Sequence, residues 1–110
     1  MGYDKADMIK GTLDMLVLKV ISLEPMHGWG ISEHIQGVSK DVLSVNQGSL
    51  YASLIRLTRA GWIRSRWRVT QHNRRARYYE LTKAGRKQLG VEKDRWRRLS
   101  GAVQRIMATT

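Results

Sequence analysis

Cysteine is absent from this chain of 110 residues, and several other features are scarce. Without cysteine the protein holds no disulfide and no thiolate metal site, which fits a reducing cytoplasm. No uncharged apolar run reaches the ~18 residues of a membrane-spanning helix, and residues 1–8 lack the layout of a signal peptide. The three histidines have no metal-ligand spacing, and no phosphate-binding loop or catalytic set is visible. We therefore expect a cytoplasmic protein that is not an enzyme, needs no cofactor or metal and does not bind a membrane.

The length indicates one compact domain. A chain of this size buries only about two-thirds of its unfolded surface, which allows a modest core but no large enzyme cleft. Hydrophobic residues make up 42% of the sequence, too many for a disordered basic tail.

Acidic residues are missing from one long stretch. The formal net charge is +11, but residues 1–41 carry −2, residues 42–79 carry +8 and residues 80–110 carry +5. The middle stretch contains no acid, and all eight of its basic residues are arginine. Because arginine presents a planar fork of donors that suits phosphates and base edges, we expect a nucleic-acid partner. An acidic protein, an anionic membrane surface or a merely solvated surface are the alternatives.

Hydrophobic spacing of three to four residues predicts four helices, over 9–23, 28–39, 47–60 and 83–108. The first helix is apolar on two sides, so we expect it to pack against two separate surfaces, for example its own core and a partner chain. The second is expected to turn Val38 inward, and residues 41–45 are compatible with an extended segment. Asn46 and Thr82 are predicted N-caps, and Gly61 is predicted to end the third helix.

Between the third and fourth helices the period changes to two. Residues 62–68 place Ile63, Ser65 and Trp67 on one face and three arginines on the other, and residues 76–81 form a second strand of similar length. The polar residues between them predict a hairpin with a basic loop.

This order of elements predicts a mainly α fold with a small β-hairpin, a winged helix-turn-helix in which the third helix lies in the major groove of DNA. Residues 1–82 would form the DNA-binding region. The expected DNA contacts on the exposed side of the third helix are Gln47, Gly48, Ser49, Tyr51, Ala52, Ser53 and Arg56. The hairpin would add Arg74, Arg75 and Arg77.

The chemistry of these residues suits the role. The helix N-terminus offers free N–H groups to a phosphate, Gln47 can pair with adenine, and Arg56 can pair with guanine or phosphate. Tyr51 can donate to a phosphate or, alternatively, lie partly buried beside Leu54. The arginines of residues 64–68 reach the DNA or point into solvent.

Residues 83–110 would form the dimerisation region, because the last predicted helix, over 83–108, is too long for one subunit to cover. At 1.5 Å per residue it spans about 40 Å, whereas a compact domain of this size has a radius of gyration near 13 Å. Its apolar residues follow heptad spacing, broken by Glu92. The expected homodimer interface consists of Leu89, Trp96, Leu99, Val103 and Ile106. Alternatively the helix packs along its own core, with Trp96 as an ordinary core residue.

Three sequence motifs resemble those of the PadR family of bacterial transcriptional regulators. They are MHGWGI at 26–31, GSLYASLIRLTRAGWI at 48–63 and RRARYYELTKAG at 74–85. The resemblance covers nearly the whole chain and is greatest to the short members, which have a single C-terminal dimerisation helix. It implies a nucleoid-associated homodimer that binds an inverted-repeat operator in double-stranded DNA, usually as a repressor released by a small molecule.

The resemblance also implies a ligand site. In the multidrug-sensing short members, the first and last helices of both subunits frame a flat apolar pore lined by tryptophans, which suits a planar aromatic molecule. The candidate ligand-binding residues here are Met8, Met15, Lys19, Leu89, Glu92 and Trp96. Lys19 and Glu92 depart from an apolar lining, since they would pair with each other or with a polar ligand. Two alternatives stay open: Trp96 only packs the dimer interface, or the protein is a ligand-independent DNA- or RNA-binding structural protein.

Overall fold

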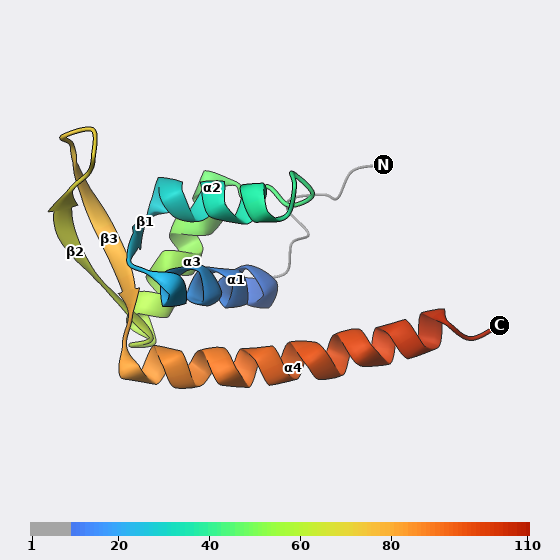
Figure 1. The fold of residues 1–110 in the computed structure, drawn as a ribbon. Coiled ribbons are helices and arrows are strands. Elements are labelled where there is room, and N and C mark those ends of the chain that lie inside the picture. Colours follow the sequence, from blue (N-terminus) through green and yellow to red (C-terminus); the bar gives the residue numbers. More distant parts are fainter. Residues whose placement is uncertain (1–9) are drawn as a thin grey trace.

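Four helices and a small sheet make up the fold (Figure 1). The computed structural model describes residues 10–110. The elements in chain order are α1 (Lys10–Leu23), β1 (Met26–His27), α2 (Gly28–Val38), α3 (Gln47–Arg59), β2 (Ile63–Val69), β3 (Arg75–Leu81) and α4 (Lys83–Met107). The predicted mainly α fold with a hairpin is confirmed.

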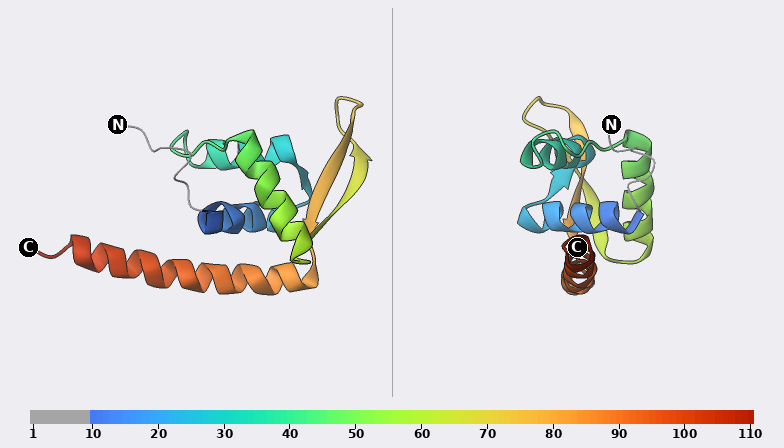
Figure 2. Two further views of the ribbon diagram at one scale, coloured as in Figure 1. Left: turned by 180° about the vertical axis from the view of Figure 1, so that it is seen from behind. Right: turned by 90° about the vertical axis from the view of Figure 1, so that its right-hand side faces the viewer.

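Helix α1 lies at the centre of the core. It packs against α2, α3, α4 and β3, and its Val17 and Leu18 are fully buried. Ile31 of α2 and Leu50 of α3 are also fully buried, so the three helices share one apolar centre. Figure 2 shows α3 crossing beside α1 and α2, with the hairpin at one end. Each apolar side of α1 therefore contributes a residue to the core of its own chain, Val17 from one side and Leu18 from the other.

The predicted helix ends are confirmed. The Asn46 side chain accepts a hydrogen bond from the Ser49 N–H (3.2 Å), and the Thr82 hydroxyl accepts one from the Gly85 N–H (3.0 Å). Gly61 directly follows Ala60, the C-cap of α3, and has a φ of +79°, a conformation that favours glycine. These caps fix where α3 and α4 begin, and therefore which of their residues face outward.

The sheet has three antiparallel strands in the order β1–β3–β2. The hairpin β2–β3 was predicted, but β1 was not, because its two residues carry no period. The prediction for Val38 is wrong: the side chain is 71% exposed, because α2 ends there and the chain turns through positive φ angles at Lys40 and Asp41. Residues 41–45 form no strand.

Helix α4 starts in the core and then leaves it. Gly85 and Leu89 are buried, whereas Trp96 is 45% exposed and Leu99 is 55% exposed. Figure 1 shows the helix running past the end of α1, and the molecule measures 56 × 33 × 20 Å. The prediction that Leu89 lies in a dimer interface is wrong, because its own chain covers it. Among the described residues, no helix combines the length and apolar character needed to cross a membrane.

Candidate nucleic-acid interface

The N-terminal half of α3 presents an exposed polar face. Leu50, Leu54 and Leu57 point into the core, which turns the opposite side of the helix outward. The predicted DNA contacts that lie on this exposed side are Gln47, Gly48, Ser49, Tyr51 and Ala52. Tyr51 is 56% exposed, so the larger part of its side chain is accessible, and the rest is covered by its own chain.

One member of this face also contacts α2. The Gln47 amide donates through Nε2 to the Ser32 hydroxyl at 3.0 Å, while the residue as a whole stays exposed. This bond links the first residue of α3 to the preceding helix. The bond fixes the N-terminus of α3 relative to α2.

Two of the predicted contacts lie elsewhere. Ser53 is completely buried, and its hydroxyl donates to Asp14 Oδ1 of α1 at 2.5 Å. The expectation that Ser53 faces DNA is therefore wrong, because α1 supplies its partner. Arg56 is partly exposed, but its fork is occupied: Nη2 lies 2.7 Å from Asp14 Oδ1, and Nε lies 3.3 Å from Oδ2. The hydrogen bond to Asp14 raises the pKa of Arg56, so the guanidinium keeps its positive charge.

The hairpin has two chemically different faces, because side chains alternate along its strands. Strand register pairs Trp67 with Arg77 and Arg66 with Tyr78. The inner face, which adjoins Tyr51 of α3, comprises Ser65, Trp67, Val69, Arg75, Arg77 and Tyr79. The outer face comprises Arg64, Arg66, Arg68, Ala76, Tyr78 and Glu80.

Arginines of the outer face are largely engaged. Arg64 Nε lies 2.9 Å from Glu80 Oε1, and Arg66 Nη2 lies 2.7 Å from the same oxygen. These two hydrogen bonds lower the pKa of Glu80. The Arg68 guanidinium carbon lies 4.7 Å from the centre of the Tyr78 ring. The outer face is therefore partly neutralised.

Arginines of the inner face have an aromatic neighbour instead. The guanidinium carbons of Arg75 and Arg77 lie 5.1 and 4.8 Å from the centre of the Trp67 ring. Arg77 also donates through Nη1 to the Ser65 hydroxyl at 3.0 Å. Among the described residues neither arginine forms an ion pair, so their charges are not neutralised. The predicted DNA-contacting residues did not include Trp67. The alternating pattern did place Trp67 on the face with Ser65, and strand pairing puts Arg77 on that same face.

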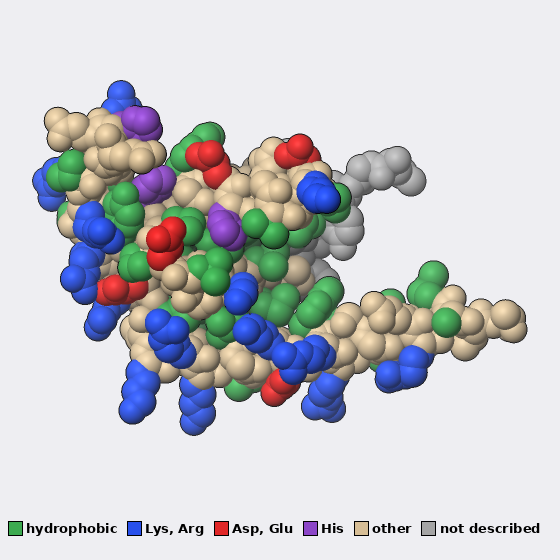
Figure 3. Space-filling model, in the orientation of Figure 1, with side chains coloured by type: hydrophobic (Ala, Val, Ile, Leu, Met, Phe, Trp, Pro, Cys, Tyr) green, Lys and Arg blue, Asp and Glu red, His purple; other side chains and the backbone are tan. Residues whose placement is uncertain are grey.

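The loop of the hairpin carries Arg74 in an exposed position. The Thr70 hydroxyl accepts hydrogen bonds from the His72 and Arg74 N–H groups, at 3.2 and 3.3 Å, and Asn73 adopts a positive φ of 58°. These bonds give the loop a defined turn. Figure 3 shows lysine and arginine side chains along the hairpin and along α4, with few acids between them.

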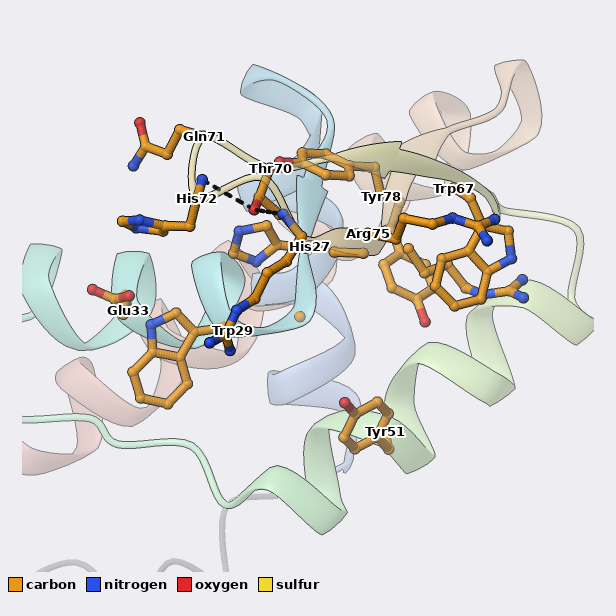
Figure 4. Close-up of a pocket in the computed structure, with 15 residues that line it drawn as sticks. His27, Trp29, Glu33, Tyr51, Trp67, Thr70, Gln71, His72, Arg75 and Tyr78 are labelled. Atoms are coloured by element: carbon orange, nitrogen blue, oxygen red, sulfur yellow. Dashed lines mark hydrogen bonds between the residues drawn. The ribbon is translucent and has the colours of Figure 1, made fainter.

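A cleft of about 990 Å³ opens between the start of α2, Tyr51 of α3 and the hairpin (Figure 4). Three arginines line it together with a single acid, Glu33. Aromatic rings form much of the rest of its wall. The aromatic and histidine residues in the lining are His27, Trp29, Tyr51, Trp67, His72, Tyr78 and Tyr79. Burial raises the pKa of Tyr79, which also lines the cleft, so this phenol adds no negative charge.

The predicted ligand-binding residues are only partly brought together. Met15 is partly buried on α1, Lys19 is exposed on the same helix, and Trp96 lies on the free part of α4. Met8 lies outside the described residues, and Leu89 belongs to the core rather than to a pore wall. Within residues 10–110 no group of three or more potential ligand side chains could hold a metal ion.

Glu92 and Lys19 are not paired with each other. Glu92 Oε1 accepts a hydrogen bond from Gln88 at 2.8 Å and lies 3.5 Å from Arg95 Nη1, both on α4 itself. The partners of Glu92 therefore lie on its own helix, and its carboxylate is not bonded to Lys19 across the predicted pore.

The chain is similar to known proteins throughout this region. Residues 17–91 match the family described as transcriptional regulator PadR-like. The fold resembles a PadR-like transcriptional regulator from Bacillus cereus, with TM-score 0.79 and 25% identity, covering 94% of this chain and 98% of that chain. It resembles a protein from Streptococcus mutans UA159, with TM-score 0.82 and 27% identity, covering 97% and 93%. It also shares the fold of Bacillus subtilis PadR in complex with operator DNA, with TM-score 0.63 and 22% identity, covering 71% and 45%.

Proposed function

This chain belongs to the PadR-like family of transcriptional regulators, and we propose from that premise that it binds a specific site in duplex DNA as a homodimer. The family and the structural neighbours are transcriptional regulators rather than enzymes. In the proposed complex, α3 enters the major groove with its N-terminal half, and the inner face of the hairpin meets the adjacent backbone or groove. The cleft between them holds the intervening sugar–phosphate strand.

The distribution of charge around the cleft is the observation that carries this proposal. On the inner face, Arg75 and Arg77 form no ion pair with a described residue, whereas Glu80 engages two arginines of the outer face. Asp14, the acid nearest to α3, is itself bonded to Arg56. The surface that α3 and the hairpin share is therefore left positive, which favours a polyanion with many phosphates. Bacillus subtilis PadR, which has this fold, is known in complex with operator DNA.

The exposed stripe of α4 supports a dimer formed through residues 83–110. Trp96, Leu99, Val103 and Ile106 are each at least 45% exposed and follow heptad spacing. A second copy of α4 would cover them across a two-fold axis. Two symmetric reading helices would then match an inverted repeat, with half-sites about 34 Å apart or a multiple of that distance.

Regulation by a small molecule is the finer part of the proposal. The protein would repress by occupying its operator, and a planar aromatic effector would release it by stacking on Trp96 near Met15 of α1. The support is that Trp96 is 45% exposed at the predicted subunit junction. Effector binding should quench tryptophan fluorescence in the wild type and not in Trp96→Ala. Equal quenching in both proteins would place the ligand elsewhere.

Footprinting on the DNA upstream of the gene and its neighbours tests the proposed function. We expect two protected patches related by a dyad, and affinity for this DNA at least about a thousand-fold above that for shuffled duplex. Equal affinity for any duplex would favour a structural DNA-binding role, and preference for an RNA hairpin would favour RNA binding. Either result would contradict the proposal.

The dimer has a matched test of its own. Leu99→Asp should yield a monomer in analytical ultracentrifugation and lose operator binding, because it buries a charge in the proposed interface. Leu23→Asp is the control, since Leu23 is also 55% exposed but lies at the end of α1. Monomers in both variants, or dimers in both, would contradict the proposed interface.

A further inference from the structure

Trp67 occupies a position that core packing does not explain. The side chain is 53% exposed, and the cluster of buried residues and its partly buried neighbours include Trp62 but not Trp67. Trp67 lies directly opposite Arg77 across the strands, and Arg75 lies two pairs further toward the loop on the same face. Figure 4 shows Trp67 and Arg75 at the same end of the cleft.

Both arginines are close enough to the indole for a cation–π interaction. The guanidinium carbons lie 5.1 and 4.8 Å from the ring centre, inside the limit of about 6 Å. At an exposed site each contact favours the stacked state of its arginine by about two- to five-fold. One ring therefore restrains two long side chains that would otherwise sample many rotamers.

The contact of Arg75 and Arg77 with Trp67 differs chemically from the ion pairs that Glu80 forms on the outer face. Glu80 restrains Arg64 and Arg66 by accepting hydrogen bonds from their N–H groups. These bonds neutralise positive charge and occupy donors that a phosphate would use. An aromatic ring attracts the guanidinium through its face and accepts no N–H bond in the plane of the fork. Both arginines consequently keep their positive charge. Arg75 keeps its in-plane donors for a bidentate partner, and Arg77 keeps the donors other than Nη1, which bonds to Ser65.

We propose, on the basis of the proposed DNA binding, that Trp67 is a positioning residue of the DNA interface. It orders Arg75 and Arg77 on the inner face of the hairpin before DNA arrives, which lowers the entropy lost on binding. Trp67 acts through the two arginines and not by a contact of its own. The expected cost of Trp67→Ala is the loss of both restraints, which weakens binding by about four- to twenty-five-fold for the half-site of each subunit and by the square of that factor for the dimer on its operator.

A double-mutant cycle separates this role from a direct contact or a structural one. The proteins are wild type, Trp67→Ala, Arg75→Ala/Arg77→Ala and the triple variant, each measured against the footprinted operator. We expect Trp67→Ala to weaken wild-type binding as stated, but to change binding by less than about two-fold when both arginines are already absent. Trp67→Phe, which keeps an aromatic face, should bind within about three-fold of the wild type.

The salt dependence of binding provides a second readout. Trp67→Ala keeps every charge, so its slope of log K against log salt should equal that of the wild type, whereas Arg75→Ala/Arg77→Ala should flatten it. An additive loss in the triple variant would overturn the inference, as would unchanged affinity of Trp67→Ala. A flattened slope and a lower melting temperature in Trp67→Ala would show a distorted hairpin and also overturn it. Absence of salt-dependent duplex binding in the wild type would instead overturn the proposed function.

Discussion

Replacing Asp14 by alanine should destabilise the protein far more than an ordinary surface change. Asp14 Oδ1 accepts hydrogen bonds from Ser53 and Arg56, and Oδ2 accepts a longer one from Arg56. These are the polar bonds by which α1 holds α3 in its orientation. Removing the carboxylate leaves a buried hydroxyl without its acceptor and a partly buried guanidinium without its counter-ion.

The magnitude follows from the degree of burial. Breaking a fully buried ion pair costs about 3–5 kcal/mol, whereas an exposed pair contributes about 0–1 kcal/mol. The side chains of Asp14 and Arg56 are 19% and 35% exposed, which places this pair between those limits, at about 2 kcal/mol. The unsatisfied Ser53 hydroxyl adds about 1 kcal/mol. The total of about 3 kcal/mol corresponds to a fall in Tm of about 12 °C for a chain of this size.

Urea unfolding and thermal melts at one fixed protein concentration measure this loss, because the stability of a dimer depends on concentration. Asp14→Asn keeps an acceptor for Ser53 and should lose about half as much free energy. Asp94→Ala is the matched control, since Asp94 and Arg97 form a 3.3 Å pair in which both side chains are 75% exposed, and it should cost less than about 0.5 kcal/mol. Equal, small losses in Asp14→Ala and Asp94→Ala would refute the reasoning.

Three further changes test the wing and the helix ends. Because its two arginine partners hold the pKa of Glu80 below its usual 4.5, this carboxylate stabilises the hairpin above about pH 4.5 and ceases to do so as the pH falls through its folded pKa. Glu80→Gln should remove that part of the acid dependence in melts from about pH 3 to pH 7, and identical profiles would contradict the assignment. In Gly85→Ala the added Cβ would lie 1.9 Å from the Trp62 carbonyl oxygen, so the free energy of unfolding should fall by about 2–3 kcal/mol. In the control Gly90→Ala the added Cβ meets nothing within 4 Å, so the free energy of unfolding should rise by about 0.5–1 kcal/mol. Asn46→Ala should cost about 1 kcal/mol in urea unfolding through loss of the α3 cap, and an unchanged midpoint would contradict this.

Periodicity predicted the elements well wherever they were long. The four helices and the hairpin follow the spacing of apolar residues, and the caps at Asn46 and Thr82 follow from short polar side chains placed just before an apolar run. Strand β1 was not predicted, because two residues are too few to show a hydrophobic period. Its partners Tyr78 and Tyr79 also lie about fifty residues further along the chain.

The site residues that were predicted wrongly have contacts with residues far away in the sequence. Ser53 falls on a polar helix position and reads as exposed, but Asp14, 39 residues earlier, supplies the acceptor that lets it be buried. Alternation showed which arginines share a face of the hairpin, whereas the pairing of the outer face with Glu80 depends on strand register. Leu89 follows the heptad of α4, yet α4 still lies against its own core at that point. The dimer interface and the ligand site remain predictions.

The most direct test of the proposed interface compares the two faces of the hairpin by salt dependence. If each subunit of a dimer contacts about four phosphates, the slope of log K against log salt should be about −7 for the wild type. Arg75→Ala/Arg77→Ala removes four inner-face charges from the dimer and should bring the slope to about −3.5. Arg64→Ala/Arg66→Ala removes the same number of outer-face charges and should leave the slope near −7. Equal slopes for the two double variants, or a wild-type slope near zero, would contradict the placement of DNA against α3 and the inner face.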